Sequence, residues 1–189
     1  MTNSTPTWNL TFQTFTDPAD ISQAIQDLAD STDTAVQSLY DAQAIGAAKP
    51  AMRAATTTTQ SIPNNTDTTL TWPAGSESFD NDTMWNDGVT SGTLTFTRAG
   101  IYLVALRCTY LATASGGGVR RVTFTHPTLG IVARNTQLGT VNDGAVLSTT
   151  AVVPVYTPGE TMTFQGLQTS SAALNTATKQ LQAFRLSTL

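Results

Sequence analysis

Residues 91–111 carry the clearest secondary-structure signal in the sequence, SGTLTFTRAGIYLVALRCTYL. Its first seven positions alternate strictly, because Leu94 and Phe96 share one face while threonines occupy the other. This period of two is typical of a half-buried β-strand. From Ile101 to Leu111 the chain is almost continuously apolar, which predicts a strand at the centre of a sheet.

Strand and turn signals repeat on both sides of this stretch at the spacing of a β-sandwich. Further strands are predicted at Asp67–Trp72, Val119–Thr125, Leu129–Arg134, Ala145–Tyr156, Thr161–Leu167 and Lys179–Leu186. Asn142-Asp143-Gly144 marks a hairpin, and 157–160 (Thr-Pro-Gly-Glu) places Pro and Gly as a type II turn requires. Eight or more strands in about 135 residues predict a mainly β protein with an antiparallel jelly-roll sandwich.

Several of these segments resemble the tumour-necrosis-factor-like jelly roll, which the globular heads of complement and collagen-type proteins share. The matching segments, within residues 52–189, are Phe79-Asp80, Trp85, 92–96, Ala99-Gly100-Ile101-Tyr102 and 156–164. The chain departs from the pattern at Glu160, where Asp is usual, and in its last strand, which keeps Phe184 but lacks the Phe-x-Gly-Phe-Leu ending. The resemblance implies a homotrimer packed through aromatic and apolar residues of one sheet.

The composition excludes several classes of function. Nine Lys and Arg against 13 Asp and Glu give a net charge of −4 with no basic run, so we expect no nucleic-acid binding. One His and one Cys cannot build a multi-ligand zinc site or a disulfide. We therefore expect no enzyme and no cofactor. We also expect neither membrane insertion nor a secretory signal, because no stretch of the sequence has the apolar length that either requires.

The acids concentrate in the first part of the chain, which predicts a separate helical element. Six Asp and no Lys or Arg precede Lys49, so this part carries −6 and the remainder +2. Residues 18–46 are predicted to form a helix, beginning after an Asp17 cap with Pro18 in its first turn. Its apolar residues at heptad spacing indicate a trimeric coiled-coil stalk, with the core positions Ile21, Ile25, Leu28 and Leu39. The alternative is an amphipathic helix lying on the surface of its own chain or of a partner.

Residues 1–17 contain four large apolar side chains without a core of their own, Trp8, Leu10, Phe12 and Phe15. They indicate a segment that docks the chain to a larger particle, and the alternative is an extra strand on the main domain. This opening and the Thr-rich, Lys-poor composition are similar to virion proteins of tailed bacteriophages. The predicted divisions are thus a docking segment at 1–17, a stalk at 18–46, a linker and first strand at 47–60, and a head at 61–189.

Candidate sites in the head are few. Asp80, Asp82 and Asp87 offer oxygen ligands for a hard cation such as calcium, but their spacing does not match a calcium-loop motif, so we expect a solvated acidic loop. Met84 and Trp85 in the same loop either form an exposed contact for a glycan or protein, or fill one end of the sandwich. His126 has no acidic neighbour in the sequence, so we expect a turn residue. Cys108 lies in the most apolar stretch, so we expect it to be a buried small side chain.

These patterns favour a homotrimeric bacteriophage protein on the virion surface, with other capsid or tail proteins as partners. Its head would attach to a host glycan or protein. The alternative is a capsid or tail decoration protein that stabilises the particle without contacting the host. A third class, a glycan hydrolase, would need two carboxylates across a groove, and the acids of the head lie mostly in predicted turns.

Overall fold

The chain divides into two units, Met1–Ala48 and Lys49–Leu189. The computed structural model describes residues 2–4, 11–13, 27–36, 49–112, 117–140 and 142–189. In the first unit, β1 (Thr2–Ser4) pairs antiparallel with β2 (Thr11–Gln13). Residues 27–36 are helical, and the hydroxyl of Ser31 donates to the carbonyl of Asp27 one turn earlier. The rest of the helix predicted at 18–46 lies outside the described residues.

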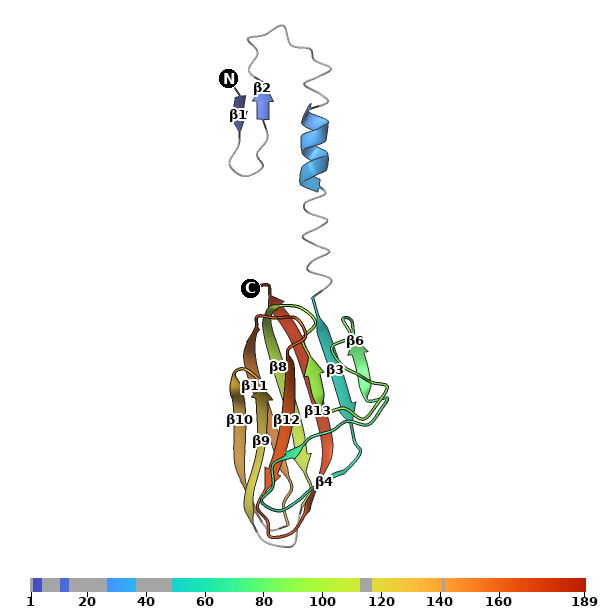
Figure 1. Ribbon diagram of the computed structural model, residues 1–189, viewed down its shortest axis with the longest axis vertical. Coiled ribbons are helices and arrows are strands. Elements are labelled where there is room, and N and C mark those ends of the chain that lie inside the picture. Colours follow the sequence, from blue (N-terminus) through green and yellow to red (C-terminus); the bar gives the residue numbers. More distant parts are fainter. Residues whose placement is uncertain (1, 5–10, 14–26, 37–48, 113–116, 141) are drawn as a thin grey trace. The chain divides into compact units, whose positions relative to one another are not determined.

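The second unit, which we call the head, is a sandwich of two antiparallel sheets (Figure 1). One sheet has five strands: β10 (Gly130–Gly139), β9 (Gly118–His126), β12 (Thr161–Gln168) and β5 (Thr68–Thr69) in that order, with β7 (Thr93–Thr95) also paired to β12. The other has six: β11 (Ala145–Val155), β8 (Gly100–Tyr110), β13 (Leu174–Ser187), β3 (Ala51–Thr56) and β6 (Glu77–Asp80), with β4 (Gln60–Ile62) also paired to β13. The mainly β, antiparallel prediction is confirmed.

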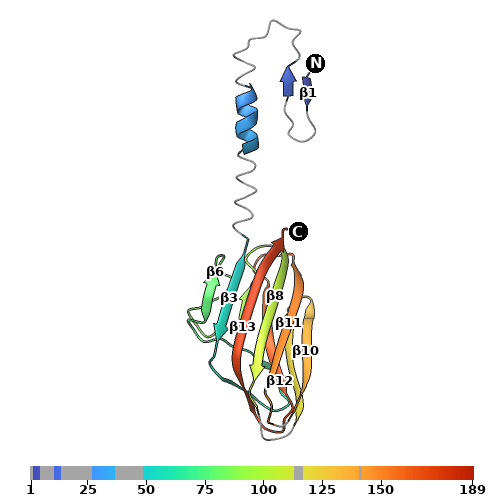
Figure 2. The same cartoon turned by 180° about the vertical axis from the view of Figure 1, so that it is seen from behind.

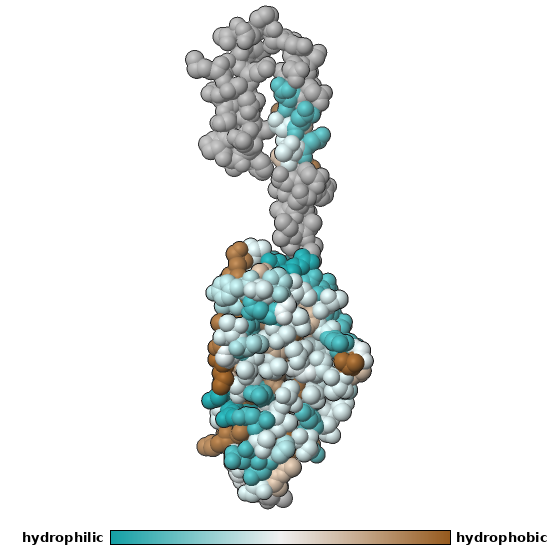
Figure 3. Space-filling view, viewed as in Figure 1, coloured by the Kyte–Doolittle hydropathy of each residue, from teal (hydrophilic) through white to brown (hydrophobic). Residues whose placement is uncertain are grey.

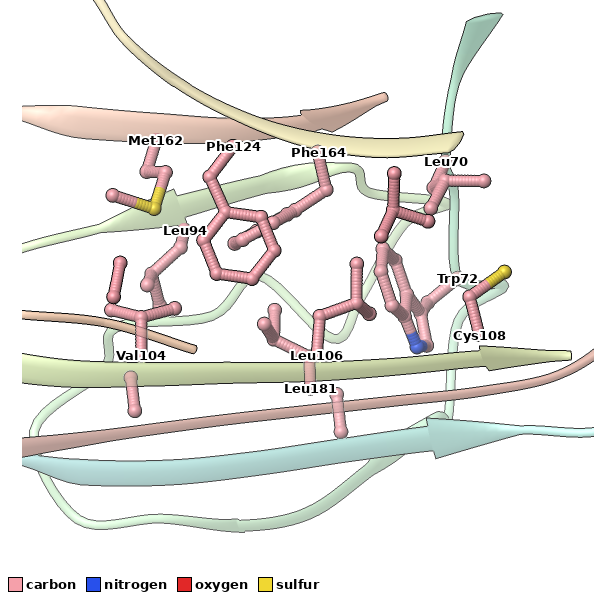
Figure 4. Packing of buried hydrophobic residues seen from close by; sticks show 14 of the residues in the cluster. Leu70, Trp72, Leu94, Val104, Leu106, Cys108, Phe124, Met162, Phe164 and Leu181 are labelled. Atoms are coloured by element: carbon pink, nitrogen blue, oxygen red, sulfur yellow. The ribbon is translucent and has the colours of Figure 1, made fainter. Parts of the chain in front are cut away.

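The central strand β8 shows why the sandwich forms. From Gly100 to Tyr110 its even-numbered residues are all buried, while the odd-numbered ones are half-buried or exposed. The buried side chains of β8 pack against aromatic side chains of the other sheet, such as Phe124 and Phe164 (Figure 4). The rings of Phe124 and Phe164 pack edge to face, with their centres 5.1 Å apart. Burial of this apolar surface supplies the main driving force for folding.

The head begins earlier than its predicted boundary at residue 61. Residues 51–56 form β3 inside the six-stranded sheet, where Met52 and Ala54 are buried in the core. Phe184 of β13 pairs with Ala51 of β3, so the start and the end of the head lie at one end of the sandwich, which we call the terminal end (Figure 2). The opposite end is called the distal end. Lys49 strengthens the terminal end by donating to the carbonyl of Leu186.

Candidate functional site

An apolar row crosses the outer face of the six-stranded sheet. Val152 of β11, Leu103 of β8, Phe184 of β13 and Ala51 of β3 are register neighbours from strand to strand. Val152 is 61% exposed and Phe184 is 41% exposed, so the row is open to contact in a single chain. We call these four residues the apolar row.

A second apolar region follows one side of the sandwich. There the edge strands β10 and β11 of the two sheets meet, and the Asn135 side-chain amide donates to the carbonyl of Ser148 at 2.7 Å. Figure 3 shows hydrophobic surface gathered along this side. Its exposed members on β10 and the turn before it, which we call the apolar edge, are Leu129, Ile131 and Leu138. Exposed apolar patches on a protein surface often mark sites of contact with other molecules.

Trp85 and Met84 do not form an exposed contact, so that interpretation of the loop is wrong. Met84 is 1% exposed and Trp85 is 5% exposed. The Trp85 ring meets Trp72 edge to face at 5.5 Å, and Trp72 in turn meets Phe164 at 6.1 Å. The two side chains are buried in the core, which agrees with the burial that the alternative prediction expected.

The acidic residues beside them are used within the protein. Asp80 accepts the backbone N–H groups of Asp82 and Trp85, at 3.0 Å and 2.7 Å. Asp82 forms an ion pair with Arg98 at 2.7 Å, and Asp87 accepts the N–H of Glu77. Within the described residues no group of three His, Cys, Asp or Glu side chains could hold a metal ion. These carboxylates stabilise turns within the head.

His126 has an acidic partner that the sequence did not predict. Its Nε2 lies 2.9 Å from Oε2 of Glu160, although the two atoms are off the axis of a good hydrogen bond. Nδ1 accepts the N–H groups of Thr128 and Leu129, both at 3.3 Å. His126 is 1% exposed and holds the turn after β9, so the prediction of a turn residue is correct while the absence of an acid is wrong.

Two basic side chains of the described head are buried, and the sequence pattern did not predict the burial of either. Lys179 is 1% exposed, and its Nζ donates to Oε1 of Gln60 at 3.0 Å and lies 5.8 Å from the Trp72 ring centre. Burial lowers the pKa of Lys179, since the charged form loses its hydration. Arg120 is 1% exposed and points inward, whereas its neighbour Arg121 faces out and pairs with Asp67. The two neighbouring arginines thus face opposite sides of the sheet, as consecutive residues of a strand do.

Cys108 is buried, as predicted. Burial raises the pKa of its thiol to about 12, so it stays protonated at neutral pH. Neither Cys108 nor His126 lies in an arrangement typical of a nucleophile with its base.

The predicted docking and stalk residues fall mostly outside the described part of the chain. Phe12 lies in β2, whereas Trp8, Leu10 and Phe15 lie outside the described residues. Of the stalk positions, Ile21, Ile25 and Leu39 also lie outside them, and Leu28 is 54% exposed on its helix. No described helix has the length and apolar character needed to cross a membrane.

Comparisons with known proteins agree with this architecture. The chain is similar to the globular domain of zebrafish complement 1qA, at 13% identity and a TM-score of 0.50, over 75% of this chain and all of that one. It is also similar to Eiger TNF from S. frugiperda, at 10% identity and a TM-score of 0.45, over 75% of this chain and 93% of that one. No protein-family model matches, and no curated protein matches. At this identity the first likeness establishes the fold alone, and that fold is the jelly-roll β-sandwich of the complement 1q globular domain.

Proposed function

We propose that the protein is a homotrimeric structural protein on the surface of a tailed-bacteriophage particle. Its N-terminal residues dock the chain to the particle, the helix forms a short stalk, and the head contacts the host surface. Three modest contacts on one trimer combine into a strong attachment, which suits this task. The chain is proposed to act by binding rather than by catalysis.

The observation that carries the proposal is the pair of apolar surfaces on the head. A three-fold assembly needs two different complementary surfaces on each subunit, because its contacts run head to tail around a ring. The apolar row and the apolar edge are two such surfaces, one on a sheet face and one on the adjacent side of the sandwich. Packing the edge of one copy against the row of the next would cover both.

The stalk gives independent support. Leu28 is 54% exposed in a single chain, although Leu at a heptad core position belongs in a helix–helix interface. The particle role is supported by the apolar opening of the chain and by a composition similar to phage virion proteins.

The particle role is tested by labelling phage particles with an antibody raised against the full chain. We expect label at the tail tip or fibres, and adsorption to the host blocked by the same antibody. Label over the capsid with normal adsorption, together with loss of heat resistance in particles that lack the protein, would assign a decoration protein instead. Particles that never carry the label would contradict both roles.

A further inference from the structure

A groove opens on the outer face of the six-stranded sheet where β3 leaves it. β13 pairs first with β4, up to Thr176, and then with β3, from Lys179 onward. Its register against β8 shifts in the same interval, between Thr176 and Lys179. The interruption leaves a hollow of about 400 Å³ between β13, residues 56–58 and the loop 73–76, which lies within the usual size of a ligand site.

The lining of this groove is polar and uncharged. It includes the hydroxyl groups of 56–58 and Thr178 and the amide of Gln180, with Ala55, Pro73 and Ala74 as apolar contacts. None of its lining residues is Asp, Glu, Lys, Arg or His. Within the described head, no protein hydrogen bond engages the side chains of Thr57, Thr178 or Gln180, so their donors and acceptors are open to a ligand. A charged ligand would find no countercharge here, and a neutral ligand rich in hydroxyl groups would find partners.

We propose that this groove binds a neutral saccharide. Sugar hydroxyls both donate and accept, as do the Thr hydroxyls and the Gln amide, and the sugar C–H groups can contact Ala and Pro. A peptide strand fits less well, because strand addition needs a free sheet edge. The Ala55 N–H already donates to the carbonyl of Ser76 at 2.8 Å, which covers β3 at this point.

Gln180 lies four residues before Phe184 on β13, which places the groove about 13 Å from the apolar row toward the distal end. The inference rests on the proposed attachment role, since it names the class of host molecule that the head would contact.

The test is saturation-transfer NMR on the full chain with glucose, galactose, rhamnose, arabinose and N-acetylglucosamine, each at about 10 mM, a concentration suited to weak binding. We expect transfer to at least one sugar. The double variant Thr178→Val with Gln180→Met keeps side-chain volume but removes the hydrogen-bonding groups, and should weaken binding about tenfold.

The control is Thr125→Val with Gln165→Met, which makes the same two changes on the five-stranded sheet and also removes the 3.5 Å hydrogen bond between these two side chains. It should bind as the unchanged protein does, and thermal midpoints show that both variants are folded. Transfer to none of the sugars, equal loss in both variants, or preferred binding of an Ala-Thr-Ala peptide would overturn the proposal. Oligomeric state and particle labelling are separate measurements, so failure of the groove leaves the trimer and the virion role standing, and their failure leaves sugar binding standing.

Discussion

His126 Nε2 lies 2.9 Å from Glu160 Oε2, and this contact joins two turns of the head at its terminal end. The histidine holds the turn between β9 and β10 through its Nδ1 atom. Glu160 holds the turn between β11 and β12, because its Oε1 accepts the N–H groups of Tyr156 and Thr157 at 3.1 Å and 2.6 Å. Each side chain therefore stabilises its own turn, and the contact between His126 Nε2 and Glu160 Oε2 brings the two turns together.

Replacement of Glu160 should separate these two roles. Glu160→Gln keeps an oxygen for the two backbone N–H groups but removes the carboxylate charge beside His126 Nε2, and should cost about 1 kcal/mol of unfolding free energy. Glu160→Ala loses both roles and should cost about 3 kcal/mol. Urea unfolding measures both values, and Glu77→Gln is the control because Glu77 makes no ion pair within the described residues. Equal costs for the two Glu160 variants would contradict this assignment.

Lys179→Met should stabilise the head at neutral pH. Desolvation lowers the pKa of Lys179 from 10.5, so the unfolded chain binds this proton more tightly than the folded chain does. Burial of the charged Lys179 ammonium lowers the unfolding free energy. This destabilisation is largest at pH values below the lowered pKa of the folded state and disappears above about pH 10.5, where the lysine is neutral in both states. In the variant, Gln60 Oε1 no longer accepts from Lys179, but it still accepts the N–H of Thr71 at 2.9 Å. The substitution therefore leaves no buried acceptor without a hydrogen bond.

The variant should gain about 1 kcal/mol at about pH 7, and this gain should shrink as the pH rises toward about 10. Urea unfolding of both proteins across that pH range gives the difference between their unfolding free energies. The contributions of the other titrating groups are nearly the same in the two proteins and cancel in this difference. A difference that stays constant with pH would show that the folded and unfolded chains bind the Lys179 proton equally.

Trp85→Ala should destabilise the head through its core. The ring is 5% exposed and packs on Trp72, so its loss leaves a cavity and should cost about 3–5 kcal/mol. Phe79→Ala is the matched aromatic control, because Phe79 is 50% exposed and its removal should cost less than about 1 kcal/mol. If Trp85→Ala unfolds at the same urea concentration as Phe79→Ala, the packing of this loop is wrong.

Calcium should not stabilise the protein. Asp80, Asp82 and Asp87 already bind backbone N–H groups or Arg98. A ligand that binds only the folded state raises its thermal midpoint, so calcium at about 5 mM should leave the midpoint within about 1 °C of that in chelator. A midpoint that rises with calcium concentration would show a site that these contacts do not explain.

Sequence patterns predicted most of the fold because the long strands obey a local rule. The alternation around Leu94 and Phe96 and the apolar run from Ile101 follow directly from one face meeting the core. β3 was placed partly in a linker because its Ala-rich sequence carries little alternation, although Met52 and Ala54 are buried.

The contacts that were missed depend on topology rather than on local pattern. His126 and Glu160 lie far apart in the sequence and meet only because β9 pairs with β12. The direction of the Trp85 ring and the burial of Lys179 likewise follow from how the two sheets stack, which no single segment encodes.

The apolar row should hold the heads together. Val152→Asp places a charge in the row and should raise the dissociation constant of the trimer at least about tenfold, since a buried unpaired charge is costly. Val89→Asp is the control, because Val89 is 54% exposed in a loop away from both apolar surfaces. Equal dissociation of the two variants would remove the row from the interface.

Sedimentation equilibrium of the full chain at about 10 µM, a concentration well above the dissociation constant of a stable trimer, tests the central claim most directly. We expect a single species of three times the 19.9 kDa chain mass. Ile21→Asp with Ile25→Asp should weaken that assembly while leaving the head folded, as near-ultraviolet circular dichroism would show. A species of one chain mass at the same concentration would contradict the trimer.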